Sequence, residues 1–343
     1  MNARLHLLVA AAAAAALAFT IVACGDEDSN GATNNGDANN GGLLGNNGTS
    51  NNGATNNGAT NNATNNGDAN NGAAQGEITH VSTIPDGARP ADAVRLIVLG
   101  DSISAGVGAS RRSRAYYALL DENADDVYPD DADIDLTSLY GHDVELVNEA
   151  VGGATTATMR ANQLPALAQR LGDSVSGHSV AVITIGGNDV TTGFAAGADL
   201  EGTYLDHALT NIRDTIEFLQ DPVRFPDGTS VFIANVYDPG DGVGRVAGCF
   251  AGIDLTEASN ALLTWARRYD DLAWDYGIGV VDALGAFRGH GFYFEDPANP
   301  YHDAADPTLW FKDDCIHPND RGHQELRRLF FEAIDPSETF VAD

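Results

Sequence analysis

Five short runs of aliphatic and β-branched residues recur between residues 94 and 282, and helical patterns lie between them. The runs cover residues 94–99, 144–148, 180–185, 231–235 and 279–282. Each run is nearly continuous in apolar residues, as is typical of parallel strands that are covered on both faces. This alternation predicts an α/β fold with one parallel sheet and helices on both faces. In such sheets, ligands bind beyond the carboxyl ends of the strands.

Three further segments carry helix signals. Apolar residues at helical spacing indicate a helix over residues 205–219. Asp254 with Glu257 resembles a capping box, which predicts that a second helix begins there and continues to Gly277. Asn319 is placed to cap a last helix near the end of the chain.

The chain begins with a segment that resembles a bacterial lipoprotein signal. Arg4 is followed by an uncharged, alanine-rich run over residues 7–22, which is short for a membrane span. Cys24 follows at its end, as in a lipobox, so we expect signal peptide 1–23 to be removed and the cysteine to be acylated. A plain secretory peptide with an incidental cysteine is the alternative. Because Gly25 rather than Asp follows, we expect an exported cell-envelope lipoprotein of the outer membrane.

Residues 24–77 are predicted to form a disordered tether. They consist almost wholly of Asn, Gly, Ala, Thr and Asp, and Leu43 and Leu44 are large apolar exceptions within 25–76. Such a segment cannot bury enough apolar surface to offset the entropy of ordering. As flexible coil it would reach roughly 40 Å. The folded domain is therefore expected to span residues 78–343.

The charge balance excludes several classes of partner. The chain has 18 basic and 49 acidic residues, for a net charge of −31. No basic stripe is present to neutralise nucleic-acid phosphates or to hold the domain against anionic lipid, so membrane contact is expected only through the N-terminal lipid anchor. The acidity fits either life at elevated salt or ordinary solubility. We expect a monomer, although the sequence carries no specific signal for the oligomeric state.

No metal site or organic cofactor is expected. Three cysteines are too few for a four-cysteine zinc site. His290, His302 and His323 lack the spacing of metal ligands and are interpreted as surface histidines or as neighbours of the site. Residues 131–135 start like a calcium loop, but Leu136 stands where that loop requires glycine.

Polar and glycine-rich motifs follow three of the predicted strands, and a fourth lies near the C-terminus. They are Gly-Asp-Ser-Ile-Ser at 100–104, the glycine-containing segment 148–156, Gly-Gly-Asn-Asp at 186–189 and Asp-Asp-Cys-Ile-His-Pro-Asn at 313–319. In this order they resemble the four signature blocks of the SGNH, or GDSL, hydrolase family over about residues 95–334. The resemblance implies a flavodoxin-like three-layer α/β/α sandwich with a five-stranded parallel sheet and esterase chemistry.

The same residues fit a serine nucleophile and its base. A serine hydroxyl needs a base to take its proton, and His317 is the candidate base for Ser102. Asp314, three residues before the histidine, could accept the Nδ1 proton and stabilise the imidazolium. Taken singly, Ser102 could instead be a helix N-cap, residues 188–189 a turn and His317 a loop histidine. Because all four motifs occur in family order, we favour the catalytic interpretation.

The oxyanion of an attacked ester needs hydrogen-bond donors that are already in place. The candidates are the backbone N–H groups of Ser102 and Gly153 and the side-chain amide of Asn188. We expect glycine at 153 because a side chain there would obstruct the acyl carbon. Gly152 matches the family's oxyanion position less well. The two aspartates beside these motifs, Asp101 and Asp189, are expected to support the loops by hydrogen bonds.

Cys249 and Cys315 are predicted to form a disulfide. They remain as an even pair once Cys24 is acylated, and an exported domain lies in an oxidising compartment. Because Cys315 lies between Asp314 and His317, the bridge would hold the loop that orients the base. Two buried free thiols are the alternative.

Two long segments flank the motifs. Residues 106–143 could form a helix and a loop over the site, and residues 285–310 could line its pocket; covering the sheet edges is the alternative role for both. The sequence thus predicts a lipid-anchored serine esterase for small-molecule or lipid esters, such as short acyl esters, lysophospholipids or acetylated glycans. A non-catalytic surface binding lipoprotein and an acyltransferase on the same scaffold remain the alternatives.

Overall fold

A single five-stranded sheet organises the computed structural model, which describes residues 92–250 and 252–336. The strand order is β2-β1-β3-β4-β5, and every pair is parallel. The strands are β1 (Ala93–Gly100), β2 (Glu145–Asn148), β3 (His178–Thr184), β4 (Thr229–Ala234) and β5 (Gly279–Val281). All five predicted strands are therefore confirmed within two residues at each end. The predicted signal peptide, Cys24 and the tether lie outside the described residues.

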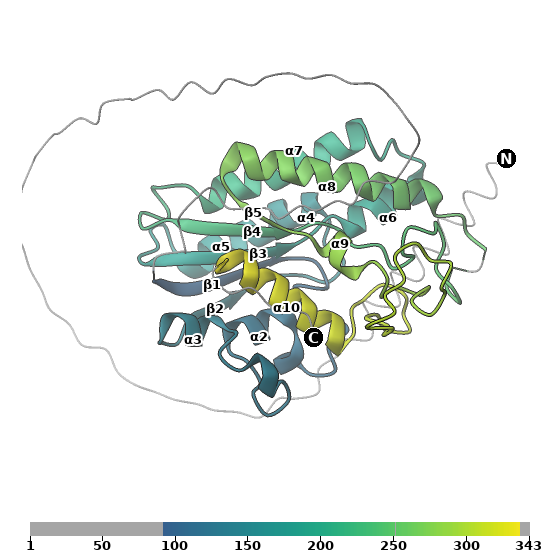
Figure 1. Cartoon of the computed structure of the whole chain (residues 1–343). Helices are drawn as coiled ribbons and strands as arrows, with labels where there is room; N and C mark the ends of the chain where they lie inside the picture. Colours follow the sequence, from purple (N-terminus) through teal and green to yellow (C-terminus); the bar gives the residue numbers. More distant parts are fainter. Residues whose placement is uncertain (1–91, 251, 337–343) are drawn as a thin grey trace, which may run out of the picture. The chain divides into compact units, whose positions relative to one another are not determined.

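Helices cover both faces of this sheet, so the predicted three-layer α/β/α architecture is confirmed (Figure 1). The α-helices are α2 (Tyr116–Asp121), α3 (Leu136–Tyr140), α4 (Thr156–Thr158), α5 (Leu164–Leu171), α6 (Gly187–Ala196), α7 (Thr203–Leu219), α8 (Thr256–Tyr276), α9 (Ala283–Phe287) and α10 (Asp320–Ile334). Two 3₁₀ turns, η1 (Arg112–Arg114) and η2 (Pro129–Asp131), and one π turn, η3 (Met159–Gln163), complete the elements.

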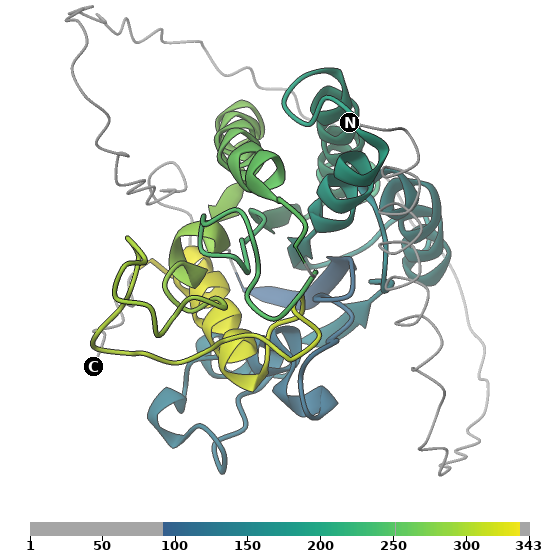
Figure 2. The same cartoon turned by 90° about the vertical axis from the view of Figure 1, so that its right-hand side faces the viewer.

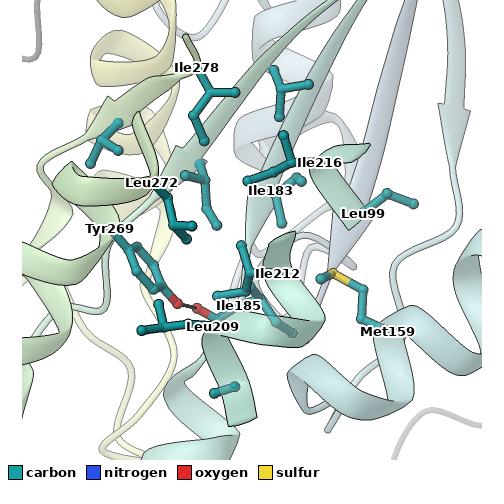
Figure 3. Packing of buried hydrophobic residues seen from close by; sticks show 14 of the residues in the cluster. Leu99, Met159, Ile183, Ile185, Leu209, Ile212, Ile216, Tyr269, Leu272 and Ile278 are labelled. Atoms are coloured by element: carbon teal, nitrogen blue, oxygen red, sulfur yellow. Dashed lines mark hydrogen bonds between the residues drawn. The ribbon is translucent and has the colours of Figure 1, made fainter. Parts of the chain in front are cut away.

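The helices α4 to α8 lie on one face of the sheet and share a core with it (Figure 1). Aliphatic side chains dominate this core, including Leu99 and Ile183 from the strands and Ile212 and Ile216 from α7 (Figure 3). The hydroxyl of Tyr269 is also buried here, and it donates a hydrogen bond of 2.9 Å to the carbonyl of Ile185. The core therefore leaves this polar atom paired while the ring fills apolar space.

The opposite face is covered by α2, α3, α9 and α10 (Figure 1, Figure 2). Its core is richer in aromatic rings, and Tyr116 of α2 stacks on Phe330 of α10 with ring centroids 5.1 Å apart. A buried ion pair joins Arg327 of α10 to Asp131. Segment 106–143 thus forms short helices, and two of its tyrosines, Tyr116 and Tyr117 of α2, are core residues that pack beneath α10.

Local helix signals were only partly correct. Helix α7 matches the predicted spacing, and Asn319 caps α10 by accepting hydrogen bonds from the first-turn N–H groups. The predicted capping box is wrong, because α8 begins at Thr256 with Leu255 at its N-cap and no side-chain cap. Asp254 instead accepts the N–H of Thr256 from outside the helix. The helix ends at Gly277 in the left-handed conformation, as predicted.

The described part of the chain also bears on membranes and metals. Within residues 92–250 and 252–336, no helix combines the length and apolar character needed to cross a membrane. The same residues contain no cluster of His, Cys, Asp and Glu with the geometry of a metal site. His290 and His323 are buried, so the surface interpretation of these two histidines is wrong.

Candidate active site

The first site segment is the turn that follows β1. Gly100 ends the strand at a φ of +125°, and a Cβ there would collide with the carbonyl of Thr184 on β3. Only glycine tolerates this combination of backbone angle and close approach. The next N–H, that of Asp101, donates to the Thr184 carbonyl at 3.0 Å. The chain then leaves the sheet, which places Ser102 beyond the carboxyl end of the strand.

Ser102, His317 and Asp314 form one hydrogen-bonded chain. The Nε2 atom of His317 lies 2.8 Å from the Oγ atom of Ser102, and its Nδ1 atom lies 2.9 Å from Oδ2 of Asp314. The histidine is only 6 % exposed, whereas the Asp314 side chain is 38 % exposed. The structure therefore brings together the three residues that the sequence predicted as nucleophile, base and orienting acid.

The electrostatics of Asp314 favour its ionised form. Its partial burial tends to raise the pKa, but hydrogen bonds from the His317 side chain and from the N–H groups of His317 and Ile316 outweigh this effect. Together they lower the pKa of Asp314 to about 2. A carboxylate facing Nδ1 holds the tautomer in which Nε2 is free to accept a proton.

The loop that carries the histidine is held by several elements. Its ends are joined by an antiparallel bridge between Phe311 and Pro318. The predicted disulfide joins Cys315 to Cys249, with Cα atoms 6.2 Å apart. The hydroxyl of Tyr237, just after β4, donates to the carbonyl of Ile316 at 2.8 Å. Two distant segments, those of Tyr237 and Cys249, thus converge on the residues between Asp314 and His317.

Each of the three predicted oxyanion donors has donor capacity left. Among the described residues, no protein acceptor pairs with the backbone N–H of Ser102 or of Gly153. Asn188, in the first turn of α6, donates from Nδ2 to the carbonyl of Ala154 at 3.0 Å, which leaves its second amide hydrogen. The first residues of a helix also favour a negative charge nearby.

The backbone supplies a second reason for glycine at position 153. A Cβ there would meet no protein atom within 4 Å, so protein crowding does not demand glycine. The backbone φ of +77° does, because other residues rarely adopt that conformation. Gly152, the weaker candidate, has ordinary backbone geometry.

Asp101 and Asp189 make the supporting hydrogen bonds that the sequence predicted. Asp101 Oδ1 accepts from the Thr184 hydroxyl at 2.9 Å and from the N–H of Ile103 at 3.1 Å. Asp189 accepts both the N–H and the hydroxyl of Thr156. Burial raises the pKa of Asp101 to about 6, since these hydrogen bonds offset only part of the desolvation. Burial also raises the pKa of Asp189.

Two side chains that contact the site segments were not predicted from the sequence. Tyr237 lies shortly after β4, which ends at Ala234, and its hydroxyl reaches the histidine loop. Its position near the carboxyl end of a strand was a weak signal. The side chain of Gln163 forms hydrogen bonds with the backbone of Gly100. Gln163 lies in a π turn, and the sequence pattern does not distinguish this turn from the helices on either side. Trp310, from the segment predicted to line the pocket, instead stacks on His290 with centroids 3.6 Å apart.

A shallow hollow elsewhere on the surface does not coincide with these residues. It lies between α5 and α7, and Arg160, Leu164, Asp214 and Phe218 are among its lining residues. None of the predicted site residues contributes to it. The side-chain geometry around Ser102 therefore defines the candidate site.

Comparisons with known proteins identify the family of the chain. The family described as GDSL-like Lipase/Acylhydrolase matches residues 96–330. No curated protein matches the sequence. Among solved structures, a lipase from a goat rumen metagenome is 20 % identical, with a TM-score of 0.49 over 70 % of this chain and 97 % of that chain. An acetylxylan esterase from Geobacillus stearothermophilus is 19 % identical, with a TM-score of 0.44 over 70 % and 94 %.

Proposed function

Because this chain belongs to the GDSL-like lipase/acylhydrolase family and is an ester-hydrolysing serine hydrolase, we propose that Ser102 is its nucleophile and that it cleaves carboxylic esters through an acyl-enzyme. The observation that supports this most directly is the hydrogen-bonded chain from Asp314 through His317 to Ser102. The family match alone assigns no role to any residue of this chain.

In the first half of the reaction, Ser102 Oγ attacks the ester carbonyl while His317 Nε2 takes the hydroxyl proton. The carbonyl oxygen gains negative charge, which the N–H groups of Ser102 and Gly153 and the amide of Asn188 stabilise. The tetrahedral intermediate then collapses. The C–O bond to the alcohol breaks, and His317 passes its proton to the departing alkoxide.

In the second half, a water molecule takes the place of the alcohol. His317 removes a proton from it as it attacks the acyl carbon of the Ser102 ester, and the same donors stabilise the second oxyanion. When the bond to Oγ breaks, the proton returns to Ser102 and the carboxylic acid leaves. Asp314 stays ionised throughout and stabilises the imidazolium in both halves.

The decisive variant is Ser102→Ala, assayed against p-nitrophenyl esters of increasing acyl length. We expect kcat/KM to fall by about 10⁴-fold or more, because nucleophilic attack is lost while substrate binding remains. Ser113→Ala, an exposed serine in the same part of the chain, is the matched control and should keep wild-type activity. Near wild-type activity of Ser102→Ala would contradict the assignment.

The physiological substrates proposed are short acyl esters, lysophospholipids or acetylated glycans. Comparing these three classes in kcat/KM with the purified enzyme ranks them directly. Added alcohols or sugars test the transferase alternative, since an acyltransferase would convert them to new esters in place of free acid. A wild-type protein without activity on any ester would favour a binding role.

We also propose that the enzyme is a lipid-anchored protein of the cell envelope, acylated at Cys24 and held in the outer membrane. The support is the sequence before and around Cys24: a basic start, an apolar run of signal-peptide length and a small residue before the cysteine. Cys24→Ser should move the protein from the membrane fraction to the soluble fraction. Unchanged partitioning of this variant would refute the anchor.

A further inference from the structure

Within the described part of the chain, no strand pairs with Gly100 on the side of β1 that faces β2. Along β1, alternate residues point their backbone groups toward β2, and the pairing with β2 ends at Val98 and Asn148. After that point the chain leaves β2, and Gly100 receives one backbone hydrogen bond from that side, from the N–H of Val151 to its carbonyl. Its own N–H faces the same direction and has no strand to donate to.

The side chain of Gln163 occupies the place of the missing strand. Its Oε1 accepts the N–H of Gly100 at 2.9 Å, and its Nε2 donates to the carbonyl of Gly100 at 2.7 Å. One side-chain amide therefore pairs with both polar groups of a single backbone residue. Gln163 is only 2 % exposed, so neither bond competes with water.

The local backbone is shaped to deliver this amide. Gln163 is the last residue of η3, a single π turn between α4 and α5. A π turn holds one more residue than an α turn, which changes the direction of the side chains that follow, and such turns are frequent at functional sites. The turn thus directs a long polar side chain to the sheet edge within an otherwise apolar helix face.

Gly100 depends on such outside support. Glycine has no side chain that could hold its φ of +125°, and Gly100 stands two residues before Ser102. Gln163, Val151 and Gly153 all lie in the segment between β2 and α5, residues 149–163. The hydrogen bonds of Gln163 and Val151 to Gly100 therefore tie the nucleophile turn to the loop that presents the Gly153 N–H.

We propose that Gln163 is a positioning residue, whose amide sets the separation between the Ser102 and Gly153 oxyanion donors. This inference rests on the proposed roles of Ser102 and Gly153. Gln163 itself touches no reacting atom. It acts through Gly100, and its loss should lower kcat while leaving KM nearly unchanged, since donors that are misplaced fail mainly in the transition state.

Two variants of the full chain test this. Gln163→Met removes both hydrogen bonds at similar volume, and we expect kcat to fall by on the order of 10- to 100-fold at every pH, because a displacement of about 1 Å can cost about 100-fold. Gln163→Glu keeps the acceptor but places a carboxylate oxygen against the Gly100 carbonyl. When protonated, that oxygen can donate as the amide does.

The pH profile then separates positioning from stability. Burial raises the pKa of a carboxyl group, so the ratio of Gln163→Glu to wild-type kcat should rise toward 1 as the pH falls from about 9 to about 5. Dividing by the wild-type value removes any pH dependence that the variant shares with the wild type. The ratio for Gln163→Met should stay low and flat.

Gln220→Glu is the matched control. Gln220 lies at the C-terminal end of α7, and its amide also donates to a backbone carbonyl, that of Tyr276 at the end of α8. Its kcat ratio should stay near 1 at every pH. All rates are expressed per folded molecule, with the folded fraction taken from circular dichroism.

The outcomes are distinct. Wild-type kcat per folded molecule in both Gln163 variants, with Ser102→Ala inactive, overturns the positioning role alone. An active Ser102→Ala overturns the proposed function instead. If the Gln163 variants lose stability but not kcat, or fail to fold even at low pH where the protonated glutamate can make both bonds, Gln163 is a structural residue and the proposal is wrong.

Discussion

The two halves of the candidate site are built in different ways. The nucleophile turn after β1 is held by the sheet: Asp101 and Ser104 donate their N–H groups to Thr184 on the neighbouring strand, and the Ser104 side chain is fully buried. The loop of His317 follows no strand. It is held by the disulfide, by the Tyr237 hydroxyl and by one isolated bridge, and its residues 312–314 are exposed.

This difference predicts how each half fails. The turn forms together with the sheet, so disturbing it should destabilise the whole domain. The loop depends on a few contacts between distant segments, so disturbing it should reduce catalysis while much of the sheet survives. The four predictions below test that contrast, beginning with the largest expected effect.

Gly100→Ala should be severely destabilising. The added Cβ would collide with the Thr184 carbonyl, and the backbone at φ +125° is unsuited to alanine. We expect the free energy of unfolding in urea to fall by more than about 4 kcal/mol, or the protein to be insoluble.

Gly172→Ala is the control for backbone angle alone. Gly172 also has a positive φ, of +85°, but a Cβ there meets no atom within 4 Å. Its cost should be about 1 to 3 kcal/mol, because its φ of +85° and ψ of −169° lie in a region that other residues avoid. Equal effects of the two substitutions would contradict the idea that the close contact with β3 locks the turn.

Reducing the disulfide should affect the two halves of the site to different extents. The bridge closes a loop with a sequence separation of 66 residues, and its removal on the chain-entropy model costs about 4 kcal/mol. Because Cys315 lies in the histidine loop, kcat should fall at reductant concentrations where helix content by circular dichroism is still native. Loss of helix content in step with activity would show that the bridge stabilises the whole domain equally.

The contrast also explains which features the sequence could predict. The strands, the order of the motifs and the Ser102–His317–Asp314 set follow from apolar runs and short local patterns. Gln163 matches no such pattern, because its importance depends on which backbone group its amide meets. The position of Tyr237 after a strand was a weak signal, but no motif marks the carbonyl that its hydroxyl meets. The start of α8 was wrong for a related reason: Asp254 makes a local hydrogen bond outside the helix, which a capping pattern does not distinguish.

The two halves should also respond to pH with opposite sign. Unfolded Asp101 releases its proton near pH 4, whereas the folded form keeps it to about pH 6, so its contribution lowers stability as the pH rises from about 4 to 6. Asp314, with its pKa lowered to about 2, contributes stability that is present above about pH 4 and is lost as the pH falls toward 2.

Asp101→Asn should therefore gain stability relative to wild type between pH 4 and pH 6. The full effect of a shift of about two pKa units is on the order of 2 to 3 kcal/mol. Asparagine keeps the Oδ1 acceptor used by Thr184 and Ile103. Urea unfolding of both proteins at several pH values measures the difference, and parallel stability curves would exclude a perturbed Asp101. Asp254→Asn, at an exposed carboxyl with a lowered pKa, should not show the gain.

Tyr237→Phe should have the smallest effect on stability and a selective effect on rate. The ring packs between Phe287 and Phe311 and would stay in place, so only the hydrogen bond to the Ile316 carbonyl is lost. Such a bond contributes about 1 kcal/mol to folding. Because that carbonyl belongs to the residue before His317, the freed loop should let the imidazole drift from Ser102, and kcat should fall several-fold with little change in KM. Tyr276→Phe, which removes a hydroxyl bond to Glu217 on the surface of α7, is the matched control and should leave kcat unchanged. If both variants keep wild-type kcat, the disulfide and the bridge between Phe311 and Pro318 are sufficient to hold the histidine loop. Tyr237 would then not belong to the contacts on which that loop depends.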